Sequence, residues 1–206
     1  DSTKVKAGRK ERGEPVYLAI TAKPGRVRHG RPTCQKQLVH LHVGTSVKLL
    51  QRLKAAGVTH VVHDGGENLE GCVPHLQRCR WHLGYQLKHY LWQDGLPHAL
   101  RGQFQDAVKQ IVSDPKQGPQ RFRRLQAKLA ALDLRTAAGH LENAAKETFT
   151  YLKEPFAYID TSPLEREMRE LNRRADIGAR WSPKGLENVL KLLFHQRLNE
   201  TCEDNR

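Results

Sequence analysis

The chain lacks the features that would tie it to a membrane, an oxidising compartment or a nucleotide. None of its 206 residues form a stretch approaching the roughly 20 apolar residues of a membrane span, and no charged-then-apolar leader opens it. Its four cysteines lack the spacing of a disulfide framework, which favours a reducing cytosol. The sequence contains no Gly-x-x-x-x-Gly-Lys motif, which excludes a P-loop and gives no indication of ATP dependence.

Positive charge is what the chain has in excess. Lys and Arg number 35 against 22 Asp and Glu, and the net charge of +13 is spread along the sequence. This charge favours a polyanionic partner, of which nucleic acid is the commonest, although a ribosomal or other basic soluble protein has the same composition. The length fits one domain with an insertion. Because the chain begins at Asp1 and not at Met, we expect a fragment or a processed product.

The first part of the chain has the pattern of strands followed by a helix. Short strands bounded by turn formers are predicted at 1–7, 16–22 and 36–43, in an antiparallel arrangement. A helix is predicted over 46–56, with Ser46 as its N-cap and Gly57 as its stop. The apolar stripe of this helix consists of Val47, Leu50 and Leu53.

A β-branched run at 58–63 follows this helix and predicts a buried strand. Residues 83–152 then have a helical pattern that requires no strand. A further helix is predicted from Thr161 to about Arg174, and a last amphipathic helix follows Pro183. The apolar positions of this last helix are Leu186, Val189, Leu190 and Leu193.

The order β-β-β-α-β, a long helical stretch and two helices matches an α/β protein of the RNase H-like class, with a mixed sheet. In this interpretation, residues 1–82 form the first part of the core. Residues 83–158 form an all-helical insertion, and residues 159–206 contribute the C-terminal core helices.

Asp64 is the most informative single residue, because it ends the 58–63 run and precedes Gly65-Gly66. A carboxylate at the end of a buried strand lies at the rim of a sheet, where functional groups of β/α proteins are commonly found. Asp64 therefore predicts a ligand for a divalent metal. Because Asp-Gly is also a common turn pair, a turn residue is the alternative.

Three segments resemble the catalytic core of Mutator-type transposases of bacterial and archaeal insertion sequences, and the resemblance covers nearly the whole chain. They are Val61-Val62-His63-Asp64-Gly65, Gln77-Arg78-Cys79-Arg80-Trp81-His82 and Leu164-Glu165-Arg166-Glu167-Met168-Arg169-Glu170-Leu171-Asn172-Arg173-Arg174. In that family, one acid lies on the first strand, the second follows the fourth strand, and a glutamate opens a late arginine-rich helix. The resemblance implies that Asp1, Asp64 and Glu165 are the catalytic, metal-binding acids.

The resemblance also implies the chemistry. Three carboxylates would bind two Mg²⁺ or Mn²⁺ ions and catalyse DNA strand cleavage and strand transfer, with the element ends and the target DNA as partners. It further implies a homodimer or larger assembly on DNA, associated with the nucleoid in a prokaryotic cytoplasm. The alternatives are an RNase H-like nuclease and a non-catalytic DNA-binding remnant. A chain that lacks residues ahead of Asp1 could also be inactive.

Each acid has a competing interpretation. Asp1 at a chain end would ordinarily be a solvated residue. Ser162-Pro163-Leu164-Glu165 is also a capping box, and Glu165 can pair with Arg169 at i+4. If the resemblance holds, Arg169, Arg173 and Arg174 contact DNA phosphates; a solvated charged face is the alternative.

The Cys79-x-x-His82 motif lies next to the catalytic centre in the resembling family. We expect His82 to contact DNA or orient an acid, and Cys79 to pack as a small buried structural residue. A core cysteine with a satisfied histidine is the alternative. Zinc bound by Cys72, His75, Cys79 and His82 is another, but only three residues separate the two pairs.

Aromatic residues alternate with basic ones after this motif. They are Trp81, Tyr85, Tyr90 and Trp92. Such mixing suits base stacking with phosphate contact, whereas aromatic residues on a helix are more often part of a core.

Overall fold

The computed structural model describes residues 2–5, 14–28, 30–175 and 182–203, and confirms the predicted α/β class. The chain divides into two compact units. Unit 1 consists of the described parts of Asp1–Val58, Leu69–Val73 and Ser162–Arg206. Unit 2 consists of Thr59–Asn68 and Pro74–Thr161, so the helices predicted within 83–158 cluster with the strands of unit 2.

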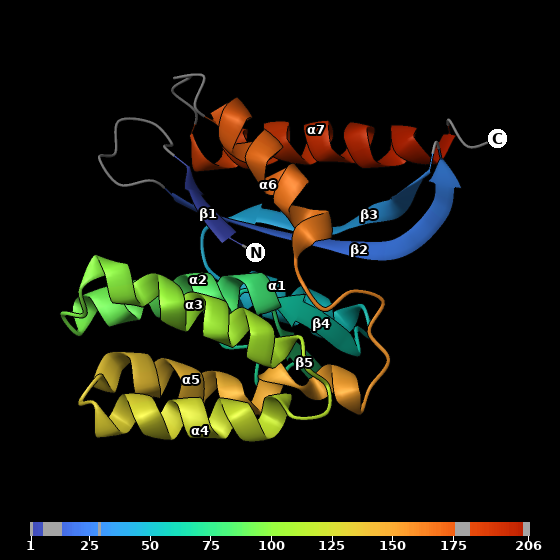
Figure 1. Ribbon diagram of the computed structural model, residues 1–206. Helices are drawn as coiled ribbons and strands as arrows, with labels where there is room; N and C mark the ends of the chain where they lie inside the picture. The colour runs from blue at the N-terminus through green and yellow to red at the C-terminus, as the bar shows by residue number, and fades with distance from the viewer. Residues whose placement is uncertain (1, 6–13, 29, 176–181, 204–206) are drawn as a thin grey trace. The chain divides into compact units, whose positions relative to one another are not determined.

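Unit 1 is built on a three-stranded antiparallel sheet in the order β1-β2-β3. The strands are β1 (Ser2–Val5), β2 (Glu14–Arg28) and β3 (Arg31–Val43), as Figure 1 shows. β2 and β3 are longer than predicted because pairing continues past Pro24, which the sequence pattern assigned to a connection. The register shifts between Pro24 and Val27, and such an irregularity accommodates a residue that has no N–H to donate.

Three helices pack against this sheet: α1 (Val47–Ala55), α6 (Ser162–Ala175) and α7 (Pro183–Glu203). α6 and α7 bury apolar side chains against β2 and β3. In α7 the buried residues recur every fourth position, which places them on one face of the helix. The shared core consists of Val16, Leu18, Leu41, Val43, Leu164, Met168, Leu171, Leu186, Leu190, Phe194 and Leu198.

The predicted apolar stripes of α1 and α7 need correction. In α1 the buried residues are Leu49 and Leu53, whereas Val47 is exposed. In α7, Val189 is exposed, and the stripe continues instead to Phe194 and Leu198. Ser46 occupies the N-cap position without a side-chain hydrogen bond, and Gly57 follows the end of α1 with a positive φ of 61°, as its predicted role requires.

Unit 2 combines a two-stranded parallel sheet with helices. β4 (His60–His63) confirms the predicted strand in a shorter form, and β5 (His75–Arg78) was not predicted. β5 has only one apolar residue, and its polar residues Gln77 and Arg78 are buried, so no alternation marks it in the sequence. The helical elements are α2 (Arg80–Gln93), α3 (His98–Val112), α4 (Gly118–Ala131), α5 (Arg135–Thr148) and the 3₁₀ helix η1 (Thr150–Leu152).

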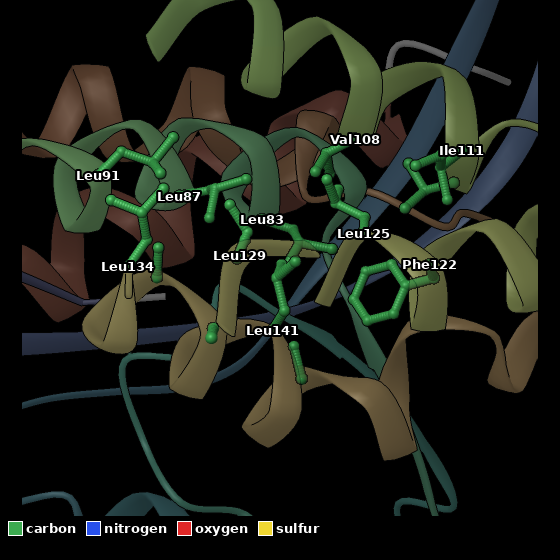
Figure 2. Close-up of a cluster of buried hydrophobic side chains, with 14 residues drawn as sticks. Leu83, Leu87, Leu91, Val108, Ile111, Phe122, Leu125, Leu129, Leu134 and Leu141 are labelled. Atoms are coloured by element: carbon green, nitrogen blue, oxygen red, sulfur yellow. The ribbon is translucent and has the colours of Figure 1, made fainter. Parts of the chain in front are cut away.

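The helices of unit 2 share one apolar core, which Figure 2 shows. Buried leucines recur at every fourth position of α2, which packs against α3 and α5, and α4 packs against the same two helices. The labelled members are Leu83, Leu87, Leu91, Val108, Ile111, Phe122, Leu125, Leu129, Leu134 and Leu141.

The longest helix, α7, has 21 residues and carries charges along its length. Among the described residues, no helix combines the length and the apolar character needed to cross a membrane.

Candidate functional site

Asp64 directly follows β4 and lies at the carboxyl end of the parallel pair β4–β5. Its Oδ1 accepts a hydrogen bond of 2.9 Å from the backbone N–H of Gly66, which is the contact of an aspartate turn. Its Oδ2 makes no hydrogen bond or ion pair within the described part of the chain. The turn proposed as an alternative is therefore formed, and it fixes one carboxylate oxygen while leaving the other available to a ligand.

Gly65 is required by the packing around this turn. Its φ is +94°, and a Cβ placed on it would lie 1.1 Å from Nη1 of Arg78. A larger residue would therefore be strained and would displace the guanidinium group. The same Nη1 donates a hydrogen bond to the backbone carbonyl oxygen of Asp64 at 3.4 Å. Arg78 thus closes the turn that carries Asp64.

Glu147 of α5 holds Arg78 in place. Its Oε2 lies 3.0 Å from Nη2 of Arg78 and 3.1 Å from Nε2 of His63; both are ion-pair contacts without hydrogen-bond geometry. Burial would raise the pKa of Glu147, but its interactions with His63 and Arg78 outweigh burial and lower that pKa. The carboxylate is therefore ionised at neutral pH and supports the Asp64 turn through Arg78.

Gln77 connects β5 to the end of α5 and to η1. It is fully buried, and its Nε2 donates to the carbonyl oxygen of Thr148 at 2.9 Å. Its Oε1 accepts a hydrogen bond of 3.0 Å from the backbone N–H of Tyr151. Because both ends of the amide are satisfied, its burial leaves no unpaired polar group. These contacts fix the strand that carries Arg78.

Cys79 is fully buried, as expected, but it acts as a hydrogen-bond acceptor rather than as a purely apolar group. Its Sγ lies 3.3 Å from the backbone N and 3.4 Å from Oγ1 of Thr161. Burial would raise the pKa of the Cys79 thiol, but hydrogen bonds from His82 and Thr161 outweigh it and lower that pKa. The Cys-x-x-His motif therefore holds Thr161.

His82 completes this contact, since its Nδ1 lies 3.1 Å from Oγ1 of Thr161. Nη2 of Arg80, in the same first turn of α2, lies 3.8 Å from Oδ2 of Asp160. The start of α2 thus binds the residues that immediately precede α6 in the chain.

Glu165 lies in the first turn of α6, where both the capping-box and the metal-ligand interpretations require it. It belongs to unit 1 and Asp64 to unit 2, so their convergence on one ion stays a prediction. Asp1 lies outside the described residues.

The arginines predicted to contact DNA follow along α6. Arg169 is exposed and makes no ion pair among the described residues, so the predicted pair with Glu165 does not form. Arg173 is exposed, and its Nη2 donates to Oε1 of Glu170 at 3.0 Å. Arg174 belongs to the helix, with its side chain outside the described part. The exposed cations suit a phosphate backbone and equally a solvated helix face.

The aromatic residues of α2 divide into two groups. Trp81 and Tyr85 are exposed, and their rings stack with a centroid separation of 5.2 Å and an interplanar angle of 8°. Trp92 is also exposed, whereas Tyr90 packs against the helical core. Tyr90 is therefore part of the core, whereas base stacking by the exposed Trp81 and Tyr85 stays a prediction.

Three side chains of unit 2 could hold a metal ion: His60, His75 and Glu154. Their candidate ligand atoms all lie within 4.8 Å of one another. His60 and His75 are paired residues at the start of β4 and β5, and their rings stack at 4.6 Å. This donor set differs from the carboxylates that the sequence predicted for magnesium.

The four-residue zinc alternative is not formed within the part of the chain that the structure describes. His75 lies against His60 and Glu154, whereas Cys79 and His82 share Thr161. Among the described residues, the candidate metal ligands that lie together are His60, His75 and Glu154, and this group includes neither Cys72 nor Cys79.

The sequence pattern marks neither Glu147 nor the group of His60, His75 and Glu154. Each glutamate comes from the end of the helical segment and contacts strands that precede that segment. The signal that could have revealed His60 and His75 is their matching position at the start of two paired strands, but this is visible only after β5 is recognised.

Comparisons with protein-family models, with curated proteins and with solved structures find no match to this chain.

Proposed function

We propose that this chain is the catalytic core of a DNA transposase of the Mutator type, which cleaves and joins DNA strands with the help of divalent metal ions. The observation that carries the proposal is the geometry of Asp64. Its carboxylate stands at the carboxyl end of a parallel strand pair, with one oxygen oriented by the Gly66 N–H and the other available.

An RNase H-like core is part of this proposal. The supporting feature is the order of elements in the chain: an antiparallel three-stranded sheet, α1, the strand that ends at Asp64, a helical segment, and α6 with Glu165 in its first turn.

Magnesium or manganese fits the residues proposed to bind it. Asp64 and Glu165 offer carboxylate oxygens, which hard divalent ions prefer, and the oriented Asp64 carboxylate has an oxygen without a partner among the described residues. Two such ions, when bound, would activate the attacking oxygen and stabilise the leaving oxygen of a phosphoryl transfer. Asp1, which lies outside the described residues, would supply the third carboxylate.

The remaining residues have supporting roles in this proposal. Arg78 and Glu147 keep the Asp64 turn rigid, and Cys79 with His82 anchors Thr161 ahead of α6. Arg169 and Arg173 would contact phosphates from the exposed face of α6. The net charge of +13 would add affinity that falls steeply with salt.

The proposed reaction has two steps, strand cleavage and strand transfer. A water molecule attacks a phosphorus atom at an element end, breaks the bond to the 3′ oxygen, and leaves a free 3′ hydroxyl. That hydroxyl then attacks a phosphorus atom of the target and releases a target 3′ hydroxyl, so that one phosphodiester bond replaces another. The carboxylates position the metal ions and form no bond to DNA.

The test uses the full chain with a supercoiled plasmid and a labelled duplex that carries a free 3′ hydroxyl, in Mg²⁺ or Mn²⁺. Hydrolysis is measured as plasmid nicking, and joining as transfer of the label to the plasmid. We expect Asp64→Asn and Glu165→Gln to abolish both activities while DNA binding survives.

Asp106→Asn and Glu142→Gln, at exposed positions of α3 and α5, are the matched controls and should retain activity. Nicking without joining would identify the RNase H-like nuclease instead. Salt-dependent DNA binding without any metal-dependent nicking would identify a binding remnant. Either result would contradict the transposase proposal.

A further inference from the structure

We propose that His60, His75 and Glu154 bind one transition-metal ion of the zinc class, at the opposite end of β4–β5 from Asp64. This site is independent of the magnesium carboxylates and of the transposase proposal. Its ligand chemistry, geometry and place in the fold each support it.

The positions of the three side chains follow from the parallel sheet. His60 and His75 are register partners, so both side chains emerge side by side at the start of their strands. Nε2 of His60 lies 3.9 Å from Oε2 of Glu154, and Nδ1 of His75 lies 3.6 Å from Oε1. Ligand atoms around a tetrahedral zinc ion are separated by roughly 3.3 Å, so small side-chain rotations would bring these atoms to bonding distance.

The second observation is an unsatisfied ring nitrogen. Nε2 of His60 is buried and has no hydrogen-bond partner, although it faces the Glu154 carboxylate. The other ring nitrogen, Nδ1, lies 2.9 Å from Oγ1 of Thr59. When Nδ1 carries the hydrogen and donates it to Thr59, Nε2 presents a lone pair toward Glu154. A cation bound between them would give both the Nε2 lone pair and the carboxylate a partner.

The donor set selects the class of metal. Two imidazole nitrogens and one carboxylate oxygen suit zinc and neighbouring transition metals, whereas Mg²⁺ prefers oxygen ligands alone. Each of the three side chains is between 32% and 34% exposed, so an ion can enter from solvent and a water molecule can complete its coordination. Phe156 packs edge-on against the His60 ring at 5.1 Å and restricts its orientation.

The place of the site in the fold indicates a stabilising role. It lies at the amino ends of the strands, about 13 Å along β4 from Asp64, whereas active sites of parallel sheets lie at the carboxyl ends. Glu154 follows η1, at the end of the helical segment. A bound ion would therefore link the end of that segment to β4 and β5 and stabilise their contact.

The experiment titrates the chelator-treated full chain with Zn²⁺ alone, and with Mg²⁺ for comparison, by calorimetry and by competition with a chromogenic chelator. His60→Phe keeps a ring that can stack on His75 and pack against Phe156 but removes both nitrogens. Glu154→Gln keeps the side-chain shape and removes the charge. His98→Ala, at an exposed histidine of α3, is the control.

We expect one Zn²⁺ per chain, bound far more tightly than Mg²⁺, with affinity reduced about 100-fold in His60→Phe and in Glu154→Gln and unchanged in His98→Ala. Zinc should raise the Tm of the parent chain and of His98→Ala but not of the two site variants. Co²⁺ should give visible absorption typical of four- or five-coordination.

Undiminished zinc binding in both site variants would overturn the proposal, because the ion would then lie elsewhere. An absence of zinc binding, with a Tm that rises on acidification and not with metal, would also overturn it. That result would mean that protons alone bridge the histidines and Glu154. DNA nicking by the Asp64 site is a separate readout, so failure of either proposal leaves the other to be judged on its own assay.

Discussion

Each unit holds a helix glutamate between two nitrogen-bearing side chains, and the two units differ in how exposed those partners are. In unit 1, Glu167 of α6 lies 2.8 Å from Nζ of Lys36 and 2.7 Å from Nε of Arg197. In unit 2, Glu147 lies 3.0 Å from Nη2 of Arg78 and 3.1 Å from Nε2 of His63. Burial would raise the pKa of both glutamates, but their partners outweigh it and lower the pKa of each.

The difference lies in the cations. Arg197 keeps 33% of its side chain exposed, so it could return to water if Glu167 were lost, whereas Arg78 keeps only 10%. Loss of Glu147 would leave a charge buried under the Asp64 turn. The cost of breaking an ion pair depends on the partner left behind, so the pair in unit 2 should be the more critical. Glu154 differs from both, because its partners are two histidines and it has no arginine or lysine partner among the described residues.

The largest effect is therefore expected from Glu147→Gln. This change should lower the free energy of unfolding by about 3 kcal/mol, because Arg78 loses its compensating charge while it stays buried. The exposed Glu142→Gln on the same helix should change it by less than about 0.5 kcal/mol. Chemical denaturation followed by tryptophan fluorescence measures both. Equal effects in the two variants would mean that the ion pair contributes nothing.

Gly65→Ala tests the turn that the same arginine closes. The new Cβ would overlap Nη1 of Arg78 at a φ of +94°, so we expect a loss of about 2 kcal/mol. Gly102→Ala in α3 is the matched control, since a Cβ there meets no atom within 4 Å. It should be neutral or stabilising by up to about 1 kcal/mol. If thermal or chemical unfolding shows that Gly65→Ala leaves the free energy of unfolding unchanged, the contact of Arg78 with this turn does not stabilise it.

Glu167→Gln probes the equivalent pair in unit 1. Its expected cost is about 1.5 kcal/mol, smaller than that of Glu147→Gln, because Arg197, whose side chain is 33% exposed, can reach water. Hydrogen exchange measured by mass spectrometry should show faster exchange in α6 and β3, with the peptides of unit 2 unchanged. A loss equal to or larger than that of Glu147→Gln would reverse the comparison.

A smaller effect is expected from lowering the pH, which should destabilise each unit through one buried histidine. Burial lowers the pKa of His140 in unit 2 to about 4, and burial together with the charges of His42, Lys191 and Arg52 lowers the pKa of His40 in unit 1 to about 4. Well above pH 6.5 these histidines are neutral in both folded and unfolded chains. As the pH falls from 6.5 toward 4, the unfolded chain binds protons that the folded chain does not, so stability decreases.

For His140 we expect a loss on the order of 1 kcal/mol between pH 6.5 and 5, and His140→Phe should reduce this slope. The contribution of His40 to this pH dependence should become smaller in high salt. Neighbouring charges help to lower its pKa, and salt screens them. Denaturation midpoints at several pH values, in low and high salt, measure both. A slope that His140→Phe leaves unchanged would exclude His140 as its source.

The same contrast explains what the sequence could predict. In unit 1, β2, β3, α6 and α7 follow from alternation, turn residues and helical periodicity, because each of these elements buries an apolar face in the shared core. β5 in unit 2 escaped prediction, because its buried positions include Gln77 and Arg78, whose partners lie in α5 and η1. Burial of polar residues depends on partners distant in sequence, which no local pattern contains.

The candidate site shows a similar division. Asp64 and the Cys79-x-x-His82 motif are marked by local sequence, and the structure assigns them a turn and an anchor for Thr161. The supporting Arg78–Glu147 pair and the group of His60, His75 and Glu154 exist only through tertiary contacts. Their chemistry is readable only after the helical segment has folded back onto β4 and β5.

The proposed function depends on the prediction that Asp64 and Glu165 hold the same metal ions. The most direct measurement is a double-mutant cycle on Mn²⁺ affinity of the DNA-bound full chain, with Asp64→Asn, Glu165→Gln and the double variant. We predict that each single change weakens binding and that the double variant loses far less than the sum of both. Additive losses, or no loss in either single variant, would contradict a shared site.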